Sequence, residues 1–253
     1  MVFIKFRCNP GDEKAILNIW MTTSQPILSL SALNTSSSTP VLEFQIHIQC
    51  VSSVHPDRPL TICTSGSILD ETKPECGHMD QLALGKLSGG LVCSDATDGT
   101  RKVISFGFFY VHRARQDNDR ATDLRKRPDV KFITVPAQES GKSVTVTHTL
   151  SSERLFAFAE KISPQDLNIG EKYSTTLSDR NIGTMWWCWG DLDNDLRGKK
   201  FHPFSEGFCC AGTEEKPSDE EIEKSGWVTG ENVAKLKFEL DAGRARCSVE
   251  VVE

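Results

Sequence analysis

The chain has 253 residues, of which 38% are hydrophobic and 25% charged, a composition typical of a globular protein with a sizeable core. The formal net charge of −6 argues against a nucleic-acid partner, because phosphate binding needs a basic surface and none dominates here. No apolar run approaches the roughly 20 residues that span a bilayer, so we expect no membrane insertion.

The first residues of the chain lack an apolar stretch of signal-peptide length, because Lys5, Arg7, Asp12 and Glu13 interrupt it. We therefore expect a cytoplasmic protein. The nine cysteines are odd in number, scattered, and contain no C-x-x-C pair of the kind that zinc ribbons and fingers use. We interpret them as buried free thiols and expect neither a metal nor a cofactor.

The first strands are indicated by hydrophobic periodicity. Residues 1–26 contain two apolar runs, at Val2–Phe6 and Ala15–Met21, to which the sequence assigns no place in the fold. Farther along, Val41–Cys50 alternates strictly between apolar and polar residues, which is typical of a half-buried strand. We expect it to form an antiparallel pair with Ile27–Leu33. One face of the predicted strand collects Leu42, Phe44, Ile46 and Ile48.

The middle of the chain predicts further short strands and two hairpins. A strand over Pro59–Thr64 precedes a hairpin of Leu91–Ser94 with Val103–Val111, in which Asp98-Gly99 makes the turn. A charged segment over 112–128 is expected to loop out. The second hairpin joins Val130–Val135 to Ser143–Leu150. In its second strand His148 falls among apolar residues, which favours a core histidine bonded to backbone over a general base.

The segment Asp166–Tyr173 is the most informative part of the chain for the fold. In immunoglobulin-like and fibronectin-like sandwiches, a leucine, a glycine turn and a tyrosine at this spacing form the corner where the chain crosses between sheets. The sequence has Leu167, Gly170 and Tyr173 at these places. We expect the Tyr173 hydroxyl to bond to upstream backbone.

The C-terminal part predicts an acidic helix or loop and a closing hairpin. Ser218 and Glu221 form a capping-box pattern within the acidic stretch 214–224. Leu236–Leu240 and Arg244–Val252 are expected to pair as a terminal β-hairpin. We therefore predict an all-β, antiparallel immunoglobulin/fibronectin-like sandwich in three parts: an N-terminal segment 1–26, a sandwich core 27–180, and an extension 181–253 packed on it.

Several of these segments resemble a group of uncharacterised filamentous-fungal immunoglobulin-like β-sandwich proteins. The similar stretches are Asp57–Ile62, Ser67–Asp70, Gly141–Leu150 and the Gly170–Tyr173 corner. This group is distantly similar to the sandwich prodomain of deuterolysin-type proteases. The chain contains no H-E-x-x-H motif, so the protease half of that comparison is missing. The resemblance implies a sandwich fold and supplies no catalytic residues.

One segment combines aromatic and acidic residues in a way that suggests a binding site. Aromatic faces stack on planar ligands or sugars, and carboxylates bind hydroxyl groups or cations, so their combination favours a ligand cleft or a partner surface. Alternating tryptophans on a strand are also compatible with a plug in the core. The candidate residues are Trp186, Trp187, Trp189, Asp191, Asp193 and Asp195.

The spacing of the three aspartates fits neither a complete calcium loop nor a zinc knuckle. Leu196 stands where an EF-hand loop needs glycine, and His202 stands where it needs the bidentate glutamate. Cys209-Cys210 and Cys76-Gly77-His78 match no zinc-ligand spacing. No metal site is therefore predicted.

Two hypotheses for function follow. The first is a noncatalytic binding or protein-interaction module that holds an unknown protein partner or a small ligand on the Trp186–Asp195 segment. The alternative is an enzyme of fungal specialised metabolism with a cleft under that segment, in which Asp191 or Asp193 acts as acid or base and His148 or His202 assists. A raised-pKa carboxylate beside a histidine would favour the enzyme, whereas a flat exposed tryptophan patch would favour the binding module.

Overall fold

The computed structural model describes most of the chain and shows a mostly β protein with several sheets. The residues that it describes are 8–35, 40–71, 82, 87, 89–93, 99, 101–107, 123–126, 130–206 and 215–253. The expected turn at Asp98, most of the charged segment 112–128 and the cysteines Cys76, Cys209 and Cys210 lie outside these residues.

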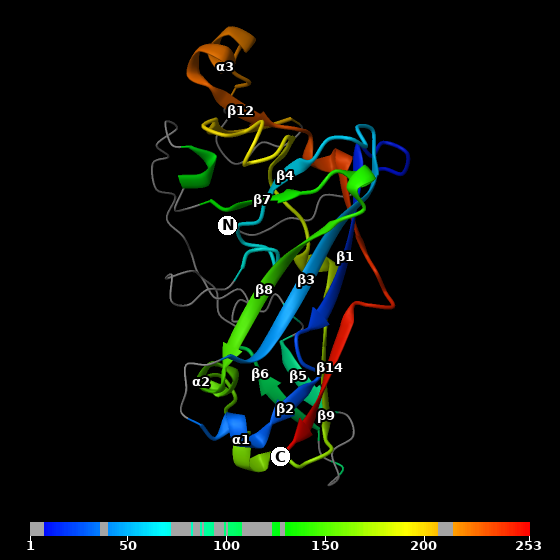
Figure 1. Ribbon diagram of the computed structural model, residues 1–253, viewed down its shortest axis with the longest axis vertical. Helices are drawn as coiled ribbons and strands as arrows, with labels where there is room; N and C mark the ends of the chain where they lie inside the picture. The colour runs from blue at the N-terminus through cyan, green and yellow to red at the C-terminus, as the bar shows by residue number, and fades with distance from the viewer. Residues whose placement is uncertain are drawn as a thin grey trace.

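A long four-stranded sheet forms the body of the molecule, with the strand order β13-β1-β3-β8 (Figure 1). Its strands are β1 (Ala15–Thr23), β3 (Pro40–Ser53), β8 (Ser143–Ser151) and β13 (Leu236–Leu240). The predicted alternation of β3 is confirmed, because one face of the strand is buried and the other is partly exposed. The buried residues include Leu42, Phe44, Ile46 and Ile48, each at most 2% exposed.

A five-stranded sheet, with the order β2-β14-β9-β5-β6, lies at the end of the molecule that carries the C-terminus (Figure 1). Its strands are β2 (Ile27–Ser29), β5 (Gly90–Cys93), β6 (Lys102–Ser105), β9 (Lys172–Thr176) and β14 (Arg246–Val252). The strands β5 and β6 form the antiparallel pair predicted for this part of the chain.

Two smaller sheets lie toward the opposite end. The three-stranded sheet has the order β10-β4-β7 and consists of β4 (Leu60–Cys63), β7 (Phe132–Val135) and β10 (Trp187–Trp189). The two-stranded sheet pairs β11 (Lys200–Ser205) with β12 (Trp227–Gly230). The chain joins β3 to β4 and β7 to β8, and each connection passes from the four-stranded sheet to the three-stranded sheet or back.

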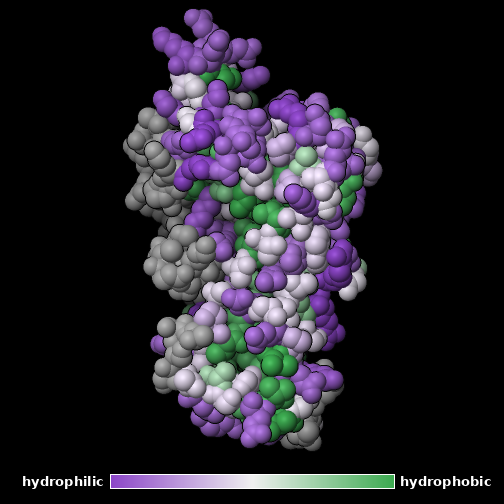
Figure 2. Space-filling view, in the orientation of Figure 1, coloured by the Kyte–Doolittle hydropathy of each residue, from purple (hydrophilic) through white to green (hydrophobic). Residues whose placement is uncertain are grey.

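Helices are few and short. The α-helices are α1 (Leu30–Leu33), α2 (Ser152–Phe156) and α3 (Asp219–Ser225), and the 3₁₀ turns are η2 (Leu124–Lys126), η3 (Gln138–Ser140), η4 (Pro164–Asp166), η5 (Asp179–Asn181) and η6 (Val233–Lys235). The predicted capping box at the start of α3 is present between Ser218 and Glu221. Figure 2 shows hydrophilic residues over this helix. In the described part of the chain, no helix is long and apolar enough to cross a membrane.

Two apolar clusters hold the sheets together. The larger one contains buried residues from the four-, five- and three-stranded sheets, among them Ile46, Val249 and Ile62. These sheets therefore enclose a continuous core, which is the arrangement of a sandwich. The second cluster is smaller and includes Trp186 and Phe201 on the other face of the three-stranded sheet.

The strand pairing differs from the prediction in direction and in partners. Among the described strands three pairs are parallel, β1 with β13, β2 with β14, and β11 with β12, so the expectation of antiparallel pairing is wrong for these strands. The predicted closing hairpin is also wrong, because β13 and β14 belong to different sheets. Between them the chain turns at Asp241–Arg244, where Met21 N–H donates to Arg244 O and so keeps the turn against β1.

The two other predicted hairpins are wrong for the same reason. The strand β2 pairs with β14 and not with β3, and β7 pairs with β4 whereas β8 pairs with β3. Strand β1 lies between β13 and β3, so the predicted N-terminal, core and C-terminal segments all contribute to one sheet. The predicted division into residues 1–26, 27–180 and 181–253 therefore stays a prediction.

The predicted crossing between sheets at the corner is confirmed, since β8 lies in the four-stranded sheet and β9 in the five-stranded one. The Tyr173 hydroxyl, expected to bond to backbone, donates to the Glu171 carboxylate at 3.0 Å. That carboxylate also accepts from the Asn168 backbone N–H and from Lys102 Nζ of β6. A buried carboxylate thus fastens this corner.

Candidate binding groove

The tryptophans of the predicted site are mainly core residues. Strand β10 pairs with β4 and directs alternate side chains to opposite faces of the three-stranded sheet. Trp187 is fully buried in the larger cluster, and Trp186, 2% exposed, lies in the smaller one. Their indole N–H groups donate to the carbonyl oxygens of Asn232 and His202. Trp189 is partly buried and contacts Trp187 and His55 edge-on.

The three aspartates form a turn directly after β10. Asp191 Oδ1 accepts the backbone N–H groups of Asp193 and Asn194, and Asp195 Oδ2 accepts that of Asp191. The Asp193 side chain makes an ion pair with Arg125 of η2. The Asp191 and Asp195 carboxylates therefore stabilise the turn, and the Asp193 carboxylate connects the turn to η2. They do not converge on a common point: the described part of the chain has no group of three metal-ligating side chains.

The two histidines of the enzyme hypothesis are bound elsewhere. His148 is fully buried, and its Nε2 shares a hydrogen bond of 2.8 Å with the carbonyl oxygen of Ile68, as the core interpretation predicted. His202 is 3% exposed and packs against the Trp227 ring, with its Nδ1 accepting from Phe204 N–H. Neither of them lines the groove described next.

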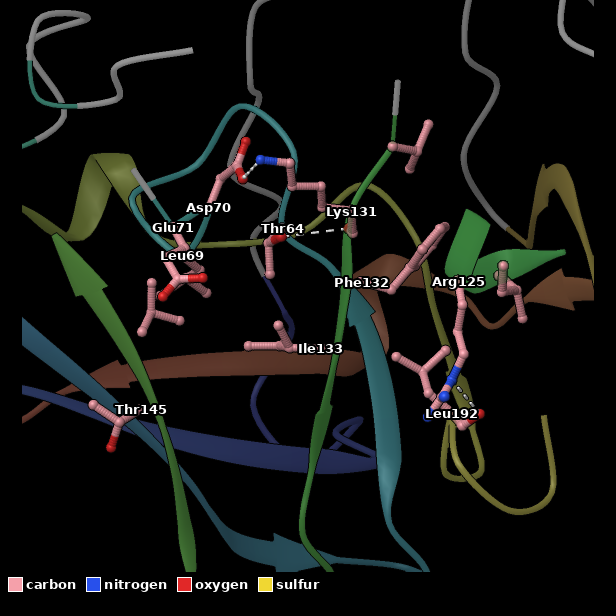
Figure 3. A pocket seen from close by; sticks show the side chains of 13 residues that line it. Thr64, Leu69, Asp70, Glu71, Arg125, Lys131, Phe132, Ile133, Thr145 and Leu192 are labelled. Atoms are coloured by element: carbon pink, nitrogen blue, oxygen red, sulfur yellow. Dashed lines mark hydrogen bonds and ion pairs between the residues drawn. The ribbon is translucent and has the colours of Figure 1, made fainter. Parts of the chain in front are cut away.

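A groove of about 440 Å³ lies beside the aspartate turn, between the edge strands of two sheets (Figure 3). One wall is β7, the last strand of the three-stranded sheet, and the other is β8, the last strand of the four-stranded sheet. The side chains that line it are Thr64, Leu69, Asp70, Glu71, Leu124, Arg125, Val130, Lys131, Phe132, Ile133, Thr145, Val146 and Leu192.

The described lining of the groove combines apolar side chains with charged groups of both signs. Asp70, 7% exposed, lies 3.3 Å from Lys131 Nζ. Arg125 donates through Nε to the Leu192 carbonyl oxygen at 3.0 Å, in addition to its pair with Asp193. The described lining holds two acidic residues, Asp70 and Glu71, and two basic ones, Arg125 and Lys131, so it has no excess charge to attract an ion.

The predicted segment lies beside this groove, but none of its six candidate side chains is among the described residues that line it. Of the predicted segment, Leu192 lines the groove, and Trp186 supports its wall through an edge contact with Phe132 at 5.3 Å between ring centres. Sequence reasoning missed Asp70 and Lys131, which lie 61 positions apart in the chain. Each stands alone in its own segment, and only the fold brings them together.

Comparison with family models, with curated proteins and with solved structures gives no match for this chain. The site is therefore interpreted from its own geometry.

Proposed function

We propose that the protein is a noncatalytic binding module that takes its ligand or partner segment into the groove between β7 and β8. The groove itself supports this proposal: its volume of about 440 Å³ lies in the range of ligand sites, and its described lining combines apolar side chains with polar and charged ones. These walls can therefore bind a ligand through apolar contacts and hydrogen bonds.

The same geometry explains why the binding module is preferred to the enzyme. A general acid or base must come within hydrogen-bond reach of the substrate proton that it transfers, and His148 and His202 are both engaged away from the groove lining. Among the charged groups that line it, Asp70 and Lys131 are bound to each other. This arrangement favours a rigid wall for a ligand.

Two finer aspects belong to the same proposal. We infer an immunoglobulin- or fibronectin-like type of sandwich, supported by the crossing from β8 to β9 at the Tyr173 corner. A cytoplasmic location and a relation to the uncharacterised fungal β-sandwich group stay proposals that rest on the sequence alone.

Methyl NMR with a fragment library tests the groove directly. We expect bound fragments to shift the methyl signals of Leu69, Ile133, Val146 and Leu192, which line the groove. The methyl groups of Leu28 and Val251, buried in the five-stranded sheet region, should stay unchanged. If shifts gather elsewhere or do not occur at any site, the groove is not the binding site.

A pair of matched variants sharpens the result. Leu192→Trp enlarges a side chain that lines the groove, and Ile169→Trp places the same ring at an exposed position of the corner before β9, outside the lining. We expect the first to weaken fragment binding at least about tenfold, or 1.4 kcal/mol, and the second to leave it unchanged. Equal effects of both variants would contradict a site in the groove.

A further inference from the structure

The β7 edge of the groove presents backbone groups that an extended chain can use. In an antiparallel ladder, residues that bond to the partner strand alternate with residues whose N–H and C=O groups point to the other side. Thr64 N–H donates to Lys131 O at 2.9 Å, so Lys131 bonds toward β4. By alternation Ile133 also bonds toward β4, and Phe132 and Thr134 direct their backbone groups toward the groove side.

These outward backbone groups have no bond to another described residue. Thr134 is engaged through its side chain, whose Oγ1 accepts from Leu192 N–H at 3.0 Å. Proteins commonly protect an open edge with a proline, a bulge or a charged residue within the strand. Residues Phe132–Val135 contain no proline and no charge, so this edge lacks that protection.

The opposite wall suits the side chains of an added strand. Ser24 N–H donates to Glu43 O, so the backbone groups of Glu43 point toward β1. By alternation those of Ile46 point toward β8, and Ile46 and Val146 form a hydrogen-bonded pair between β3 and β8. The Val146 side chain is buried on the inner face, where it lines the groove with Ile133. A strand added to β7 would direct every second side chain toward this apolar wall.

We propose that the groove binds an uncharged, extended peptide segment, which adds to the outer edge of β7 as a further strand of the three-stranded sheet. This proposal rests on the proposed function and names its ligand. The occupant is uncharged because the described lining carries two acidic residues, Asp70 and Glu71, and two basic ones, Arg125 and Lys131, and so has no excess of either sign. Alternate apolar side chains of the peptide fill the groove, and its backbone bonds to Phe132 and Thr134.

The test uses linear peptides about ten residues long, enough to span β7 and its flanks, selected by display against the full chain. The recovered peptide is synthesised unmodified and in two N-methylated forms, each methylated at one set of alternate residues. We expect the unmodified peptide and one methylated form to bind, and the other form to lose binding, because only one set of N–H groups faces β7.

Amide hydrogen exchange on the complex identifies the strand edge. Binding should slow the exchange of Phe132 and Thr134 amides at least about tenfold and leave Ile133 unchanged, because the Ile133 N–H is already bonded to β4. If no peptide is recovered, if these amides are not protected, or if both methylated forms bind equally, strand addition is wrong. Fragment binding in the groove would then show whether the proposed function survives without it.

A matched pair of variants adds a control. Thr134→Val removes the hydroxyl group and keeps the backbone N–H, whereas Thr134→Pro removes both. We expect Thr134→Val to retain peptide binding and Thr134→Pro to lose it. Equal binding by both would contradict the proposal. If Thr134→Pro does not fold, the N-methylated peptides decide the question on the unaltered protein.

Discussion

Trp187 shows how one residue type supports two opposite interpretations. In the sequence it belongs to a cluster of tryptophans beside aspartates, which suggests a ligand cleft. In the structure its ring is fully buried in the main core, and its indole N–H donates to Asn232 O at 3.0 Å. A buried tryptophan with a satisfied N–H contributes to stability, and it offers no surface to a ligand.

Trp187→Ala is therefore expected to lower the free energy of unfolding by about 3–5 kcal/mol, because it removes a large buried ring and leaves a cavity. Chemical denaturation followed by circular dichroism measures this change. Asp193→Asn is the control: Asp193 is exposed, and its ion pair with Arg125 lies at the surface, so the change should stay below about 1 kcal/mol. A small effect of Trp187→Ala would contradict its place in the core.

At the scale of elements, the corner before β9 is fastened by one carboxylate. Burial by itself would raise the pKa of Glu171, but hydrogen bonds from Lys102, Asn168 and Tyr173 outweigh it and hold the pKa below its ordinary value of 4.5. Lys102 belongs to β6 and Tyr173 to β9, and these strands lie on either side of β5. The carboxylate therefore connects the corner to two strands of one sheet.

This lowered pKa predicts how stability depends on pH. The unfolded chain binds a proton at Glu171 near pH 4.5, whereas the folded chain does so only at lower pH, so the stabilisation is present above 4.5 and is lost as the pH falls through the folded pKa. We expect Glu171→Gln to cost about 2–3 kcal/mol at neutral pH and to reduce the loss of stability below pH 4.5. Urea unfolding of both proteins at a series of pH values measures the difference, and parallel pH profiles would show that Glu171 is not responsible.

At the scale of the whole molecule, the C-terminal strand joins parts of the chain that are distant in sequence. Strand β14 lies between β2 and β9, with parallel pairing to the first and antiparallel pairing to the second. Its side chains Val249 and Val251 are at most 1% exposed. A terminal hairpin would have been a local addition, but this strand is an interior member of the five-stranded sheet.

Deleting residues 241–253 is therefore expected to abolish cooperative unfolding, because it leaves β2 and β9 without their common partner and opens the main core. Thermal unfolding followed by near-ultraviolet circular dichroism tests this, with deletion of Glu253 alone as the control. A truncated protein that still unfolds in one sharp transition would show that β14 is dispensable.

The features that depend on neighbouring residues could be predicted from the amino-acid sequence. Alternation identified the buried face of β3, the Ser218 and Glu221 spacing identified the start of α3, and Leu167 to Tyr173 identified the crossing between sheets. Each depends on backbone geometry within a few residues, which the local sequence encodes.

The strand pairing and the position of the groove, by contrast, depend on contacts between segments that are distant in the sequence. The pairing of β1 with β13 joins Ala15 to Leu236, and the groove brings Asp70 and Lys131 together from separate segments. An alternating strand has the same pattern whichever partner it meets, because its side chains specify a buried face and not a neighbour. The packing of the whole core decides which strands pair. It therefore also decides which strand edges stay open for the proposed ligand.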